Sequence, residues 1–120
     1  MRINDTNELM LPYDLQQKML EKSGEIDEAI AEYRARSTAW VEAQRTARVA
    51  FNSALLAAEA KNAQERKALA EQSSEALLYA EEMCKALRDS ALEALRAKRE
   101  QLNALNALCY TVREEMKLAR

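Results

Sequence analysis

From residue 25 to residue 120 the chain contains neither glycine nor proline, because its one glycine is Gly24 and its one proline is Pro12. These two residue types are the ones that most often interrupt helices. Alanine, leucine, glutamate, lysine and arginine dominate the same stretch, and only 5% of the chain is aromatic. A composition of this kind is typical of long helices and coiled coils. The sequence therefore predicts a single all-α domain.

The breaker residues divide the first part of the chain. Pro12 suits the first turn of a helix, and Gly24 suits the position just past the end of one. We therefore expect a short leading helix over residues 12–22, preceded by an irregular N-terminal arm over residues 1–11.

Two longer helices are expected after Gly24, over residues 25–60 and 74–118. The stretch over residues 57–76 is polar and poorly periodic, so we expect the turn there, with Ser73 and Ser74 as candidate N-caps. The competing interpretation is one unbroken helix from residue 25 onward. A hairpin is favoured, since two helices with one apolar stripe each can cover one another.

Each long helix carries apolar or small residues at alternating spacings of three and four, the heptad pattern of helix packing. The third helix breaks this alternation at Ala94–Lys98–Leu102, a stutter that locally unwinds a supercoil. The first predicted packing seam runs through Ile26, Ile30, Tyr33, Ser37, Trp40, Gln44, Ala47, Phe51, Ala54 and Ala58, and the second through Ala80, Cys84, Leu87, Ala91, Ala94, Lys98, Leu102, Leu105, Cys109, Val112 and Met116.

These patterns predict a long antiparallel helical hairpin, coiled-coil-like, with a short N-terminal helix. Many seam residues are alanines, so the hairpin buries less apolar area than a globular domain of equal length. Oligomerisation is the expected source of the missing stability.

The residues needed for most catalysis are missing. The chain has no histidine, the commonest general base and transition-metal ligand. It also lacks phosphate-binding glycine motifs. Cys84 and Cys109 would lie roughly 37 Å apart on one helix, too far to form a disulfide. We expect no enzyme activity, no metal, no cofactor and no small-molecule substrate. No stretch of the sequence is apolar enough for a membrane span.

The charges are unevenly distributed. Residues 34–50 carry four arginines against one glutamate, and residues 85–120 carry eight basic and five acidic side chains. If the start of the second helix lies near the end of the third, the two positive segments become neighbours. Around a ring of subunits they would make a positive band, and such a band binds a phosphate backbone. The DNA-binding hypothesis rests on Arg34, Arg36, Arg45, Arg48, Lys98 and Arg99.

The roles of Trp40 and of the arginines near it remain open. Trp40 on the predicted seam is favoured as a packing residue, with base stacking as the alternative. Arg34, Arg45 and Arg48 lie within roughly 60° of one another around the helix axis. They are flanking charges of a coiled coil, partner-facing charges or phosphate contacts. Lys98 is expected to extend past small neighbours toward solvent.

The segments "EYRARSTAWVEAQRTARVAF" (residues 32–51) and "ALLYAEEMCKALRDSALEALRAKREQLNALNALCYTVREEM" (residues 76–116) resemble the two halves of the phage recombination mediator family. The resemblance is one of alanine, arginine and leucine spacing, and it covers residues 25–118. It implies a ring-forming α-helical oligomer that binds single-stranded DNA. It further implies assistance in loading a RecA-like recombinase onto DNA coated by single-strand binding protein.

The sequence thus predicts a non-enzymatic phage recombination accessory, a homo-oligomer whose partners are single-stranded DNA and a recombinase or single-strand binding protein. We expect it in the cytoplasm, the host's if the chain is phage-encoded. The alternative is a coiled-coil interaction or scaffold protein without DNA binding, such as a virion assembly factor or an inhibitor of a host protein.

Overall fold

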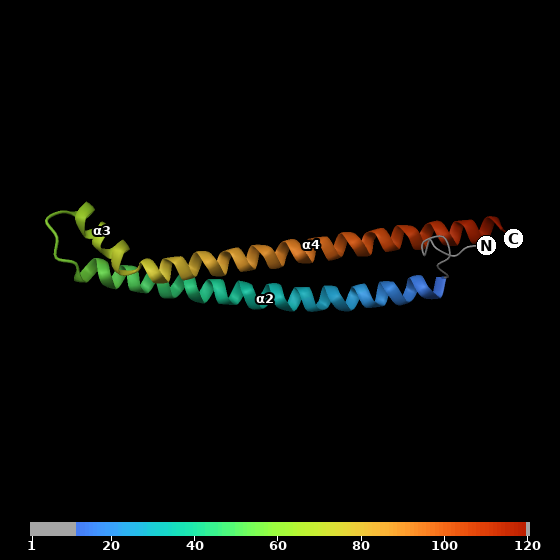
Figure 1. The fold of residues 1–120 in the computed structure, drawn as a ribbon, viewed down its shortest axis with the longest axis horizontal. Coiled ribbons are helices and arrows are strands. Elements are labelled where there is room, and N and C mark those ends of the chain that lie inside the picture. The colour runs from blue at the N-terminus through green and yellow to red at the C-terminus, as the bar shows by residue number, and fades with distance from the viewer. Residues whose placement is uncertain (1–11, 120) are drawn as a thin grey trace. The chain divides into compact units, whose positions relative to one another are not determined.

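The computed structural model describes residues 12–119, and the fold is an all-α helical hairpin (Figure 1). Helix α2 spans Pro12–Ala57, α3 spans Ala63–Ser73, and α4 spans Glu75–Leu118. The described part of the chain contains no strand. The predicted all-α hairpin is confirmed, and the expected N-terminal arm lies outside the described residues.

Helix α2 begins at Pro12, but the expected end of a leading helix at Gly24 is absent. The helix continues through Gly24 to Ala57, so the segments expected as two helices are one. A glycine inside a helix costs about 1 kcal/mol relative to alanine, which weakens a helix without ending it. Leu15 and Ile26 are both buried. Packing on either side of Gly24 therefore outweighs its low helix propensity.

The turn of the hairpin lies at residues 58–62, where the chain is not helical. Asn62 caps α3, because its side-chain oxygen accepts a hydrogen bond from the Glu65 N–H at 2.8 Å. Ser74 separates α3 from α4. Its hydroxyl donates backward to the Ala70 carbonyl instead of capping the start of α4.

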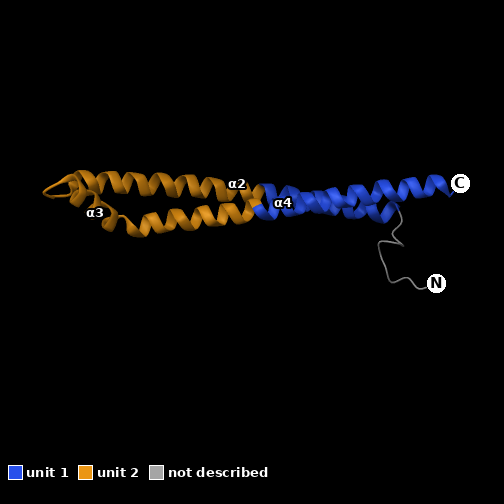
Figure 2. Ribbon diagram, turned by 90° about the horizontal axis from the view of Figure 1, so that it is seen from above, with its two compact units in different colours: residues 1–30, 93–120 blue, residues 31–92 orange. Residues whose placement is uncertain are grey.

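The hairpin divides into two units, coloured separately in Figure 2. The described part of unit 1 joins residues 12–30 of α2 to residues 93–119. Unit 2 comprises residues 31–92. Within each unit the α2 and α4 segments run antiparallel. Unit 1 buries Leu15, Ile26, Leu95 and Cys109, whereas unit 2 buries Ala47, Ala70 and Ser74.

On α2, every residue of the predicted seam is buried or half-buried. These include Ile26, Ile30, Tyr33, Trp40 and Phe51. The line also continues toward the start of the helix, to residues that were assigned to the separate leading helix. They are Leu15, Met19 and Lys22.

On α4, the predicted seam is buried or half-buried at Cys84 and Ala91 and again from Lys98 onward, through Leu102, Leu105, Cys109 and Val112. Ala80, Leu87 and Ala94 are exposed in the single chain, as is Met116 near the C-terminus. Glu81, Arg88 and Leu95 are buried or half-buried in place of their exposed neighbours Ala80, Leu87 and Ala94. With these residues the line keeps its alternating spacings of three and four, so no stutter occurs at Lys98.

The continuity of α2 predicts the effect of replacing its glycine. A Cβ atom built at Gly24 meets no other atom within 4 Å, and the backbone has no positive φ there. We expect Gly24→Ala to raise the free energy of unfolding by about 0.5–1 kcal/mol. Urea unfolding followed by circular dichroism measures this value. A destabilised variant would show that the chain needs a break at this position.

Candidate nucleic-acid interface

The four arginines of residues 34–50 lie on α2 in unit 2, and they differ in their surroundings. Arg34, Arg45 and Arg48 are exposed, and none of them forms an ion pair with any residue between 12 and 119. Arg36 is half-buried, and its Nε lies 3.1 Å from Oε1 of Glu32. Of the four arginines in the DNA-binding hypothesis on α2, three therefore have unpaired guanidinium groups within the described residues.

Arg48 faces an acidic groove. It shares this groove with Glu71 of α3 and with three glutamates from the beginning of α4, around a floor that includes Ala47 and Phe51. A phosphate group here would meet the negative potential of four carboxylates. Arg34 and Arg45 are therefore better placed for phosphate contact than Arg48. The three α4 glutamates are Glu75, Glu81 and Glu82.

Trp40 is half-buried, and its ring face is already occupied. The guanidinium carbon of Arg88 lies 4.4 Å from the ring centroid, a cation–π contact between α2 and α4. The indole nitrogen of Trp40 is buried without a hydrogen-bond partner in the described part of the chain. This geometry matches the packing interpretation, because a base cannot stack on the ring face that Arg88 covers.

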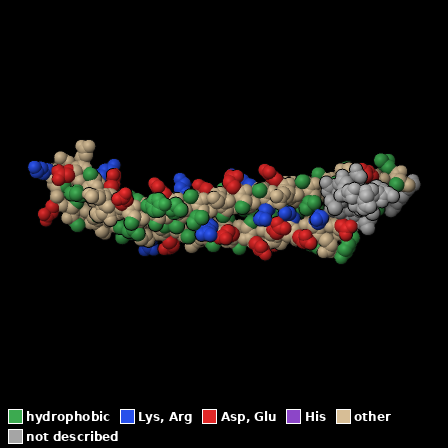
Figure 3. Space-filling view, in the orientation of Figure 1, with side chains coloured by type: hydrophobic (Ala, Val, Ile, Leu, Met, Phe, Trp, Pro, Cys, Tyr) green, Lys and Arg blue, Asp and Glu red, His purple; other side chains and the backbone are tan. Residues whose placement is uncertain are grey.

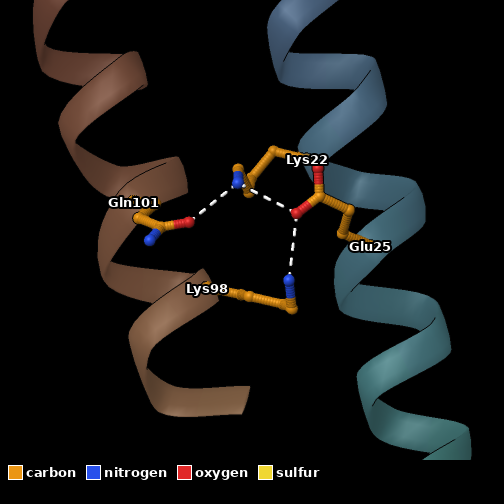
Figure 4. Close-up of polar contacts among 4 residues, drawn as sticks. All are labelled: Lys22, Glu25, Lys98 and Gln101. Carbon is orange, nitrogen blue, oxygen red and sulfur yellow. Dashed lines mark hydrogen bonds and ion pairs between the residues drawn. The ribbon is translucent and has the colours of Figure 1, made fainter. Parts of the chain in front are cut away.

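Unit 1 contains a polar cluster where a heptad would ordinarily place apolar residues (Figure 4). Nζ of Lys22 donates to Oε1 of Glu25 at 3.0 Å and to Oε1 of Gln101 at 2.7 Å. Nζ of Lys98 donates to the same Glu25 oxygen at 3.0 Å. The cluster joins α2 to α4 and sets their register within the unit.

This cluster changes the assignment of Lys98. Its ammonium group is held against Glu25 of α2 instead of extending freely into solvent. Arg99, the next residue, is exposed and makes no ion pair within residues 12–119. Of the two α4 residues in the DNA-binding hypothesis, only Arg99 is free to meet a phosphate.

The two positive segments fall largely in different units, so they are not neighbours within one unit as expected. Residues 34–50 belong to unit 2, whereas most basic residues of 85–120 belong to unit 1. Because α2 begins at Pro12, its acidic first part, and not residues 34–50, lies beside the end of α4. Unit 2 as a whole has nine basic and nine acidic side chains, so it carries no net charge.

Sequence reasoning missed Arg88 and Glu25 as structural residues. Arg88 stands seven residues before Leu95 and fourteen before Leu102, so heptad counting from those leucines identifies it as a seam position. No local signal links Glu25 to Lys98, which lies 73 residues away along the chain.

No protein-family model matches the sequence, and neither a curated protein nor a solved structure matches it. Within residues 12–119, no helix has a stretch long and apolar enough to cross a membrane. The same residues hold no group of three or more histidine, cysteine, aspartate or glutamate side chains placed to bind a metal ion.

The polar cluster predicts an acid-sensitive contribution to stability. Hydrogen bonds from Lys22 first, and from Lys98 second, hold the pKa of the Glu25 carboxyl below its ordinary value of 4.5. The carboxylate therefore stabilises the folded state above pH 4.5, and this contribution is lost as the pH falls through the lowered folded pKa. We expect Glu25→Gln to flatten the acid limb of a plot of melting temperature against pH. The exposed Glu28 supplies the control, and equal curves for Glu25→Gln and Glu28→Gln would contradict the assignment.

The cation–π contact predicts a change that the tryptophan itself reports. We expect Arg88→Gln to lower the free energy of unfolding by about 0.5–1 kcal/mol and to alter the emission of Trp40, the chain's one tryptophan. Chemical unfolding followed by fluorescence measures both effects. Arg96→Gln is the control, because Arg96 pairs only with Glu93 on the helix surface. Unchanged emission in Arg88→Gln would show that the contact does not persist in solution.

Proposed function

We propose that this chain is a non-enzymatic accessory protein of phage recombination. In this proposal it acts as a homo-oligomer, binds single-stranded DNA and assists the loading of a recombinase. The observation that carries the proposal is the pairing state of the arginines on α2. Arg34 and Arg45 are exposed and unpaired within the described chain, on a segment that resembles the recombination mediator family.

The chemistry of the surface supports a contact with the DNA backbone. Guanidinium groups bind phosphate oxygens and carry no information about base sequence. The ring face of Trp40 is covered by Arg88, which disfavours base stacking there. The proposed binding is therefore electrostatic, independent of sequence and weakened by salt.

A second candidate is a coiled-coil interaction or scaffold protein without DNA binding. Two observations favour it: the four glutamates that share a groove with Arg48, and the absence of net charge on unit 2. The two candidates differ in one measurable property, the affinity for an oligonucleotide. A chain that assembles but binds no DNA is a scaffold or interaction protein.

The test compares the DNA affinity of a variant that lacks the unpaired Arg34 and Arg45 with that of a variant that lacks the paired Arg36. We expect the double variant Arg34→Gln/Arg45→Gln to weaken binding to a fluorescein-labelled oligonucleotide equally for different sequences. Each lost contact should reduce the slope of log affinity against log salt by roughly 0.7. Fluorescence polarisation over a salt series measures both quantities.

The matched control is Arg36→Gln, because that side chain is already paired with Glu32. It should retain most of the affinity and the parental salt slope. Binding by the double variant that equals the parent's at every salt concentration would remove Arg34 and Arg45 from the proposal. Absence of binding by the parent protein would leave the scaffold function.

A further inference from the structure

A groove in unit 2 lies where three helices meet. Residues of α2 from Gln44 to Phe51 form one wall, α3 forms the second, and the beginning of α4 forms the third. The groove has a volume of about 910 Å³, which is enough for several side chains of a ligand. Its α2 wall is roughly 10 Å long, or two helical turns. The groove is therefore long enough to contact two turns of a neighbouring helix.

The interior of the groove is apolar and partly aromatic. Ala47 is buried at the α2 wall, and Phe51 and Leu78 are half-buried. Tyr79 lines the groove and is 64% exposed. Aromatic rings contribute large apolar areas at protein-binding surfaces, where they are enriched. Apolar side chains of a ligand would therefore gain burial against these residues.

The border of the groove carries more acidic than basic side chains. Its charged residues are Arg48, Glu71, Glu75, Glu81 and Glu82. None of these five forms an ion pair with another residue between 12 and 119, so three negative charges are uncompensated. On the face drawn in Figure 3, by contrast, charged side chains of both signs are interspersed along α2 and α4. The negative potential is a local property of the groove, since unit 2 as a whole has no net charge.

The spacing of the carboxylates indicates the shape of the occupant. Glu75 and Glu82 lie seven residues apart on α4, which is the interval at which a helix repeats the same face. Leu78 lies between them on that face. A partner helix with basic residues two turns apart would pair with both carboxylates, while its apolar residues contact Leu78 and Tyr79. This arrangement is that of an amphipathic helix in a groove.

We propose that the groove binds a basic amphipathic helix of another protein. Lysine or arginine side chains of that helix pair with the glutamates at the border, and its apolar side chains pack against Phe51, Leu78 and Tyr79. Arg48 repels a basic residue at its own place in the groove, so it contributes to the choice of register. The inference goes beyond the proposed function, because it involves neither DNA nor the arginines proposed to bind it.

The test uses a synthetic peptide as the probe. It is a fluorescein-labelled amphipathic helix of roughly 18 residues, with leucine at heptad spacing and arginine on both flanks. Two control peptides replace every arginine by glutamine or every leucine by alanine. Fluorescence polarisation at about 0.1 M salt measures their affinities for the full chain. We expect each control peptide to bind roughly tenfold more weakly than the probe.

Matched variants of the protein locate the site. Glu75→Gln/Glu82→Gln removes two exposed carboxylates from the border, whereas Glu100→Gln/Glu115→Gln removes two exposed carboxylates of α4 that lie outside the groove. We expect the first variant to bind the probe roughly tenfold more weakly than the parent protein does. The second variant should bind the probe like the parent.

The aromatic contribution has its own matched pair. Tyr79 and Tyr110 are 64% and 66% exposed, so replacing either by alanine removes no buried side chain. We expect Tyr79→Ala to weaken binding of the probe several-fold and Tyr110→Ala to leave it unchanged. Circular dichroism melts establish that all four variants are folded.

The outcomes separate the groove from the proposed function. Absence of saturable binding of the probe by the parent protein overturns the proposal. Equal losses in the two double variants overturn it as well, because the peptide is then held by the overall charge of the chain. An oligomer that dissociates in Glu75→Gln/Glu82→Gln would show that a second copy occupies the groove, which overturns an external partner. Binding of the probe at the groove by a chain that binds no DNA supports the inference and removes only the DNA-binding role.

Discussion

The contact between α2 and α4 is a narrow seam, and most other features of the structure follow from it. Each helix touches the other along a single line of residues, many of them alanine or polar. In unit 2 that line leaves only Ala47 fully buried. Because burial of apolar area is the main stabilising contribution to folding, such a seam is a weak core. Apolar side chains that a globular domain would bury therefore remain on the surface.

The seam gains specificity from its polar members. In unit 1, Glu25 accepts hydrogen bonds from Lys22 and Lys98, and the pairing fixes which turn of α4 lies opposite which turn of α2. In unit 2, Arg88 occupies a seam position and covers Trp40. Polar residues at heptad core positions commonly specify register at some cost in stability. A chain built this way relies on further contacts for its stability.

The sequence predicted the fold well, and it predicted α2 better than α4. The α2 seam is the one apolar line on its helix, so heptad counting found it. In the first part of α4, counting found Cys84 and Ala91 but chose Ala80 and Leu87 over their half-buried neighbours Glu81 and Arg88. Periodicity alone cannot choose between neighbouring positions, because the choice depends on which residues of α2 lie opposite. Gly24 failed as a helix end for a related reason, since packing on both sides overrides local propensity.

The candidate site was the least predictable part, since whether an arginine or lysine is free depends on residues far away in the sequence. Lys98 is paired across 73 residues, whereas Arg34 and Arg45 are unpaired within the described chain. The central claim is the proposal that the chain acts as a homo-oligomer. The most direct measurement is the thermal unfolding midpoint over a hundredfold range of protein concentration. The account predicts a midpoint that rises with concentration, because association stabilises the folded chain by mass action. A midpoint that is the same at every concentration would contradict it.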